Sequence, residues 1–145
     1  MVVTFREEGC FIFGTTRLTA EALYILRGCA LAGWTALAAL YGSALPLPYH
    51  PPVLQFVCQS LEDVVARAKQ TSIRVWRGKA RLSLGTRLGK EAEVIEGAVP
   101  SREFKCGLYI QSYAEAVEHI ATYGPGKRYL KLLPKYLLYW DLNSL

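Results

Sequence analysis

Apolar and polar positions divide the chain into an N-terminal β segment, a long apolar stretch and a C-terminal half that mixes both kinds of pattern. Residues 2–13 contain two apolar, β-prone runs, VVTF and CFIF, around the polar turn REEG. Such a pair of runs predicts a β-hairpin. Residues 20–41 form the longest apolar stretch and end before Gly42, a common residue just after a helix. They predict one long helix.

The helix expected over residues 20–41 allows three interpretations. It contains Arg27, and no Lys, Arg, Asp or Glu follows until Glu62. At 1.5 Å per residue it spans about 33 Å, which is enough to cross a bilayer. It is also rich in Ala and Gly, which contribute little to membrane insertion and let another backbone pack closely. We therefore expect a central helix buried in the core of the domain, with a membrane span and an oligomer contact as the alternatives.

Four prolines follow in the phrase ALPLPYHPP, at positions 46, 48, 51 and 52. Prolines at this density cannot continue a helix and favour an extended polyproline II segment. Because apolar residues flank the cluster, we expect a stiff connection between two helices, the alternative being a ligand for a groove that binds polyproline II segments. Ser60 and the acidic pair Glu62 and Asp63 then predict a second helix that ends near Gln70.

Two β segments are expected after this helix, at residues 72–84 and 91–97, with a hairpin through the phrase GTRLG. The alternation of the first segment changes phase at Gly78, which predicts a bulge or a tight bend there. The tail, residues 127–145, predicts one or two strands that are interrupted at its proline and docked into the core.

A short apolar strand at residues 107–110 leads directly into a helix at residues 113–123, and a Gly-Pro pair marks the end of this helix. Ser112 and Glu115 form a capping box, in which each side chain bonds to the backbone N–H of the other residue. His119 lies next to the buried face of the helix. We interpret it as a histidine with satisfied hydrogen bonds at the core boundary, not as a general base.

Length and composition fit one domain, residues 1–145, with 52% hydrophobic and 20% charged residues as in globular proteins. The expected elements give an α+β fold: a mostly antiparallel sheet, the long central apolar helix and two shorter helices. The N-terminus lacks a basic region followed by an apolar one, so we expect no signal peptide. An intracellular location follows, cytoplasmic or, for a viral source, associated with the virion.

Four cysteines, at positions 10, 29, 58 and 106, lack the close spacing that zinc ligands usually show. The histidines at positions 50 and 119 supply no matching pair. We therefore expect no metal site and no cofactor, and we expect the cysteines to be reduced and mostly buried thiols.

The surplus of positive charge is confined to one segment. The chain has 17 Lys and Arg against 12 Asp and Glu, a net charge of +5, and residues 61–90 hold eight of the basic residues and two acidic ones. A tryptophan stands among these cations, and the combination suits phosphate contacts with a stacked base. The candidate site for an anionic partner, with nucleic acid the favoured one, comprises Arg74, Trp76, Arg77, Lys79, Arg81 and Arg87.

Arg77, Lys79 and Arg81 alternate along the chain and are expected to share one face of a strand, with Trp76 beside them. The alternative is an edge strand whose charges prevent pairing with another sheet. The hairpin expected after this strand also brings the three glutamates at positions 91, 93 and 96 opposite the cations. These glutamates are expected to neutralise part of the charge.

The phrase GLYIQSYAEAVEHIATYG resembles the strand-to-helix segment of ADP-ribosyltransferases of the diphtheria-toxin and poly(ADP-ribose) polymerase class. The resemblance implies NAD as a cofactor and a nucleotide site that includes Gly107, Tyr109 and Tyr113 or Tyr123, one of which would stack near nicotinamide. The catalytic glutamate of that family lies on a later strand, whereas no glutamate follows Glu118 here. The resemblance therefore implies a degenerate member of the class.

The leading hypothesis is a non-enzymatic binding or assembly protein whose basic strand, residues 74–81, contacts an anionic partner. The first alternative is a degenerate ADP-ribosyltransferase-like domain that binds NAD or a related nucleotide. The second is a structural subunit of a homo-oligomer or a larger assembly, for instance a viral one. We expect no catalytic residue and no membrane span.

Overall fold

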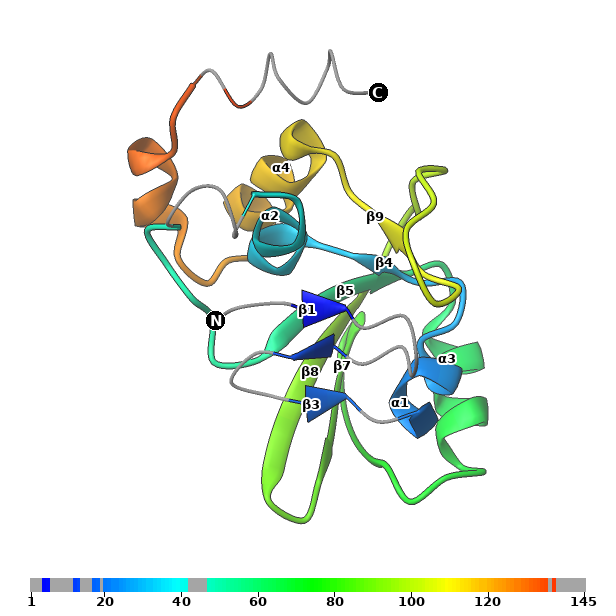
Figure 1. Ribbon diagram of the computed structural model, residues 1–145. Coiled ribbons are helices and arrows are strands. Elements are labelled where there is room, and N and C mark those ends of the chain that lie inside the picture. The colour runs from blue at the N-terminus through cyan, green and yellow to red at the C-terminus, as the bar shows by residue number, and fades with distance from the viewer. Residues whose placement is uncertain are drawn as a thin grey trace.

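The computed structural model describes residues 4–5, 12–13, 17–18, 20–41, 47–135 and 137, and its centre is a six-stranded mixed sheet with the strand order β6-β7-β8-β5-β4-β9 (Figure 1). The strands of this sheet are β4 (Ala30–Leu31), β5 (Leu54–Cys58), β6 (Arg74–Gly78), β7 (Arg81–Thr86), β8 (Gly89–Glu96) and β9 (Tyr109–Ile110). A smaller antiparallel sheet contains β1 (Thr4–Phe5), β2 (Ile12–Phe13) and β3 (Arg17–Leu18).

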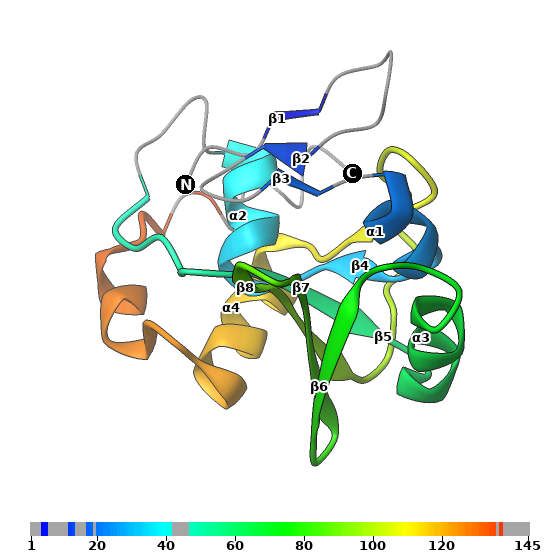
Figure 2. The ribbon, with the colours of Figure 1, turned by 90° about the horizontal axis from the view of Figure 1, so that it is seen from below.

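Two pairs of helices flank the large sheet. The helices are α1 (Ala20–Ile25), α2 (Gly33–Tyr41), α3 (Leu61–Ala68), α4 (Tyr113–Tyr123) and the 3₁₀-helix η1 (Lys127–Leu132). In both views α1 lies beside α3, and α2 lies beside α4 (Figures 1 and 2). No helix in the described part of the chain is long and apolar enough to cross a bilayer.

The pairing of the strands confirms the predicted α+β class with a mostly antiparallel sheet. The pairs β6/β7, β7/β8 and β4/β5 are antiparallel, whereas β5/β8 and β4/β9 are parallel. The N-terminal hairpin is also confirmed where it is described, because β1 pairs with β2 and Thr4 lies opposite Phe13. The turn of this hairpin lies outside the described residues, and so does Pro46, the first proline of the cluster at positions 46–52.

The long helix predicted over residues 20–41 is wrong, because the structure divides this stretch into α1, β4 and α2. Two glycines in the left-handed region mark the division: Gly28, with a φ of +82°, follows the end of α1, and Gly33, with a φ of +52°, is the first residue of α2. The expected burial is correct, since Leu31, Trp34 and Leu37 are fully buried. A core helix and a buried strand carry the same apolar composition, so the pattern alone did not separate them.

Strand β5 was not predicted, although it is one of the two central strands of the sheet. All five of its residues are buried, so its sequence LQFVC does not alternate. The proline segment before it therefore connects α2 to a strand and not to a second helix. The tail prediction is also wrong, because residues 127–132 form η1 instead of a strand. The tail is docked as expected, since Leu133 and Leu137 are buried.

The helices predicted at residues 60–70 and 113–123 are confirmed as α3 and α4. Ser60 caps α3 by accepting a hydrogen bond from the backbone N–H of Asp63 at 3.3 Å. The capping box of α4 is complete: Ser112 Oγ accepts from the N–H of Glu115 at 3.2 Å, and Glu115 Oε1 accepts from the N–H of Ser112 at 2.9 Å. Both helices therefore begin where their sequence signals place them.

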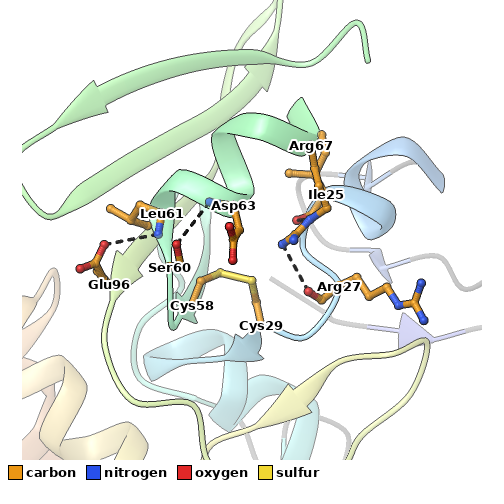
Figure 3. Close-up of a disulfide and its surroundings, with 9 residues drawn as sticks. All are labelled: Ile25, Arg27, Cys29, Cys58, Ser60, Leu61, Asp63, Arg67 and Glu96. Atoms are coloured by element: carbon orange, nitrogen blue, oxygen red, sulfur yellow. Dashed lines mark hydrogen bonds between the residues drawn. A yellow bond between two sulfur atoms is a disulfide. The ribbon is translucent and has the colours of Figure 1, made fainter. Parts of the chain in front are cut away.

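A disulfide joins β4 to β5 through Cys29 and Cys58, so the prediction of reduced thiols is wrong (Figure 3). The two residues stand one position beyond the paired Ala30 and Val57, and their Cα atoms are 4.5 Å apart. Cys106 is disulfide-bonded as well. Cys29 and Cys58 are 29 residues apart in the sequence. Only the fold makes them neighbours, and no sequence signal indicates it.

The side chain of Arg67 fastens α3 to α1 beside this disulfide (Figure 3). Its Nε donates to the carbonyl of Ile25 at 2.9 Å, and a terminal guanidinium nitrogen donates to the carbonyl of Arg27 at 3.4 Å. Ile25 is the last residue of α1 and Arg27 lies two residues beyond it, so neither carbonyl has a partner within the helix. One arginine of the basic segment thus serves the fold.

Candidate nucleic-acid interface

The basic segment forms a β-hairpin and not one continuous strand. Gly78 pairs with Arg81, so Lys79 and Ala80 form a two-residue turn, and Ala80 has a φ of +56°. This is the tight bend predicted at Gly78, displaced by one residue. Arg77, Lys79 and Arg81 consequently belong to a strand, a turn and a second strand. The prediction that they share one face of a strand is wrong.

The register of the hairpin decides which side chains share a face. Residues that pair across strands point to the same side of the sheet. Trp76 pairs with Ser83, which pairs with Glu93, while the neighbouring pair of Leu82 and Val94 is buried in the core. The face that carries Trp76 is therefore the one turned away from the core on strands β6 to β8.

Four residues on this open face define what we call the Trp76 surface: Arg74, Trp76, Arg81 and Lys90. Arg74 and Trp76 are two positions apart on β6, and Arg81 lies opposite Gly78. The register of β7 and β8 shifts between Leu84 and Gly85, and the ammonium of Lys90 lies 5.9 Å from the centroid of the Trp76 ring. The indole remains 36% exposed.

The other predicted cations lie elsewhere on the hairpin. Arg77 points to the opposite side of β6 and forms an ion pair with Glu62 of α3, which lowers the pKa of that carboxyl. Lys79 is in the turn between β6 and β7. Arg87 is in the turn between β7 and β8, at the other end of the strands. Arg77 is thus separated from the Trp76 surface, and the two turn residues lie at its ends.

The expected neutralisation by glutamates is partial. Glu93 lies 3.7 Å from Arg81. Glu96 instead accepts a hydrogen bond from the backbone N–H of Leu61 at the start of α3, at 3.3 Å. Among the described residues, no acidic side chain forms an ion pair with Arg74 or Lys90. The Trp76 surface therefore retains positive charge on both sides of the indole.

A cluster of buried polar side chains surrounds the N-terminus of α2, which sequence reasoning did not identify. The backbone N–H of Gly33 donates to Gln111 Oε1 at 2.9 Å, and that of Trp34 donates to Gln55 Oε1 at 2.8 Å. The N–H of Gln55 in turn donates to the Thr35 hydroxyl at 2.7 Å. Two glutamines from β5 and the β9–α4 junction therefore cap α2 in place of the usual Ser, Thr, Asp or Asn.

His119 completes this cluster and differs from its prediction. It is 95% buried, and its Nε2 has no hydrogen-bond partner among the described residues. Burial, and secondarily the charge of Arg81, lower its pKa to about 4, so it is neutral near pH 7. A pocket of about 340 Å³ lies beside it, between α4 and residues 97–98, with Tyr123 on its wall. The histidine is a core residue, not a satisfied one at the boundary.

The residues implied by the ADP-ribosyltransferase resemblance line different places. Gly107 and Tyr109 line a pocket of about 240 Å³ with Glu103. Tyr113 is buried against Tyr41, with ring centroids 5.9 Å apart. Tyr123 packs on His119 at the other end of α4, with centroids 4.9 Å apart. The described residues also contain no group of His, Cys, Asp or Glu suited to hold a metal ion.

No family model and no curated protein matches the chain. Among solved structures, it is similar to the crystal structure of the Megavirus polyadenylate synthase, with a TM-score of 0.46 and 14% sequence identity. The similarity covers 83% of this chain and 28% of that chain, so this chain spans less than a third of the viral protein's length. A likeness at this level carries no argument about activity.

Proposed function

We propose that the protein binds single-stranded nucleic acid, without catalysis, on the Trp76 surface. The observation that carries the proposal is the exposed indole of Trp76, which has the ammonium of Lys90 5.9 Å from its ring centroid and Arg74 and Arg81 on the same face. Proteins that bind single strands combine cations that track the phosphates with aromatic rings on which bases stack. Four residues of this surface supply both kinds of contact.

Trp76 distinguishes nucleic-acid binding from the alternative of edge protection, in which the charges only prevent an edge strand from pairing with another sheet. Strand β6 is the last strand of the sheet, and Lys or Arg side chains on such a strand prevent it from pairing with another sheet. Arg77, paired with Glu62, already places a charge there. Edge protection does not require an exposed indole, whereas base stacking does.

We infer from the disulfide that the protein works in an oxidising environment. The Cys29–Cys58 disulfide joins two core strands, and disulfides persist at cell surfaces, in secretory compartments and on virions, but are rare in the cytosol. This supports the virion-associated alternative over the cytoplasmic one.

The proposal is tested by the fluorescence anisotropy of a labelled single-stranded oligonucleotide titrated with protein at low salt. We expect Trp76→Ala to weaken binding about tenfold or more, because base stacking on an aromatic ring is worth about 1–3 kcal/mol per base. Trp76→Phe keeps an aromatic ring and is expected to retain most of the affinity. Equal affinity of the wild type and Trp76→Ala, or no binding at all at low salt, contradicts the proposal.

A further inference from the structure

A second group of aromatic rings and cations is found at η1, the orange segment that lies apart from β6 in Figure 2. Tyr49 and residues 124–129 line a pocket of about 450 Å³ at the junction of α4 and η1. We call it the Tyr49 pocket. Its volume lies in the range of small-molecule sites. The basic hairpin includes none of its residues, and the phrase that resembles ADP-ribosyltransferases ends at one of them, Gly124.

Hydrogen bonds from the core hold the wall of the Tyr49 pocket in place. The indole Nε1 of Trp34 donates to the carbonyl of Pro125 at 2.9 Å, and Gln55 Nε2 donates to the carbonyl of Gly124 at 3.3 Å. Gly126 has a φ of +85°, and a Cβ there would lie 2.6 Å from Tyr49 Cδ1. The pocket is therefore formed before any ligand arrives, which lowers the cost of binding.

A row of contacting aromatic rings, the first pair tilted and the second stacked, runs from the core to the rim of the pocket. The ring centroids of Trp34 and Tyr49 are 5.6 Å apart, and those of Tyr49 and Tyr129 are 5.2 Å apart at an interplanar angle of 16°. The guanidinium carbon of Arg128 then lies 4.9 Å from the centroid of the Tyr129 ring. Arg128 Nη2 also donates to the Tyr129 hydroxyl at 3.0 Å, and a guanidinium held beside an aromatic ring in this way can support a further planar group, such as a base.

The charge of the pocket is positive and is not neutralised locally. Lys127 and Arg128 are both exposed, and no described acidic side chain forms an ion pair with either. The sequence contains no Asp or Glu between Glu118 and Asp141. Lys127 and Arg128 both line the pocket, and a guanidinium and an ammonium suit a phosphate group, which accepts charge-assisted hydrogen bonds from both.

We propose that the Tyr49 pocket binds a nucleoside monophosphate, with the phosphate on Lys127 and Arg128 and the base against the aromatic and guanidinium groups. A ligand with an anionic group and a flat apolar body matches both halves of the pocket. Inorganic phosphate matches the cations alone, and a nucleoside matches the aromatic half alone. The inference is independent of nucleic-acid binding at the Trp76 surface.

Isothermal titration calorimetry with AMP, adenosine and inorganic phosphate tests this inference on the full chain. We expect AMP to bind about tenfold or more tightly than either fragment, because only AMP makes both kinds of contact. Arg128→Gln is expected to weaken AMP binding about tenfold, whereas Lys135→Gln, an exposed cation in the same segment but outside the pocket, is expected to leave it unchanged.

Four results would overturn the inference. The first is no heat from AMP at millimolar concentration. The second is equal affinity for AMP and inorganic phosphate, which would leave an anion site only. The third is an equal loss of affinity in Arg128→Gln and Lys135→Gln, which would indicate general attraction to a basic protein. The fourth is loss of AMP binding in Trp76→Ala. AMP binding that persists in this variant supports the inference, so the test of the Tyr49 pocket is separate from the test of the Trp76 surface.

Discussion

His119 shows at the scale of one residue how burial fixes a protonation state. Its imidazole packs between Tyr123 and the N-terminus of α2, and a Cβ at Gly33 would lie 3.1 Å from its Cδ2. The same Cβ would lie 2.6 Å from Gln55 Oε1, so a side chain at position 33 would displace Gln55 and press on His119. Protonation would place a charge in this buried site near Arg81, which explains the lowered pKa of about 4.

The stability of the protein is expected to depend on pH through His119. Between pH 6.5 and 4 the unfolded chain protonates this histidine while the folded chain does not, so the unfolded state binds more protons and stability falls as the pH falls. The contribution is complete above pH 6.5 and is lost toward pH 4. By pH 4.5 the resulting loss of stability is about 2–3 kcal/mol for a pKa shift of this extent.

Urea unfolding of the wild type and of His119→Gln at pH 7 and at pH 4.5 measures this contribution. The stability advantage of the wild type over the variant should be about 2–3 kcal/mol smaller at pH 4.5. Every ionisable group other than His119 is present in both proteins, so the contributions of those groups cancel in the comparison. An advantage that stays the same at both pH values would show that His119 does not titrate as described.

At the scale of elements, the helix caps are the features that sequence signals specify most firmly. Ser112 and Glu115 cap α4 reciprocally, and Ser60 caps α3. These signals are local, since each depends on residues three positions apart. The N-terminus of α2 depends instead on Gln55 and Gln111, which lie 21 and 78 residues from the groups that they cap. No local pattern can announce such a cap.

Ser112→Ala is expected to destabilise the protein by about 1 kcal/mol, because the N–H of Glu115 loses its acceptor. Glu118→Ala is the matched control, since Glu118 is an exposed residue of the same helix outside its first turn. It should change stability by less than about 0.5 kcal/mol. Chemical denaturation measures both variants, and indistinguishable midpoints would mean that the cap contributes nothing.

The same distinction explains which strands could be predicted. The hairpin around residues 85–89 has an alternating pattern and a Gly-rich turn, so its existence followed from the sequence. Strands β4 and β5 are buried on both faces and carry no alternation, and β4 is only two residues long. The Trp76 surface was identified only in part. Lys90 belongs to this surface and Arg77 does not. The alternation of the sequence revealed neither the turn after Gly78 nor the register shift next to Lys90.

At the scale of the whole molecule, the Cys29–Cys58 disulfide joins the start of β4 to the end of β5. It closes a loop with a sequence separation of 29 and lies where α1, α3 and the sheet meet (Figure 3). Both half-cystines are only 2% exposed. Such a link stabilises mainly by restricting the unfolded chain.

Replacement of both residues, in Cys29→Ala/Cys58→Ala, is expected to lower the free energy of unfolding by about 3–4 kcal/mol, as loop-closure entropy predicts for a loop of this length. Thermal and urea unfolding under non-reducing conditions measure the loss. A loss below about 1 kcal/mol would contradict the stabilising role of this disulfide.

The salt dependence of single-strand binding tests the central claim most directly, because Arg74 and Arg77 lie on one strand but on opposite faces. Each phosphate neutralised on a single strand contributes about −0.7 to the slope of log K against log salt concentration. We predict that Arg74→Gln makes the slope shallower by about 0.7 and that Arg77→Gln, whose cation is paired with Glu62, leaves it unchanged. Equal slopes in the two variants, or a slope near zero in the wild type, would contradict the assignment of the Trp76 surface.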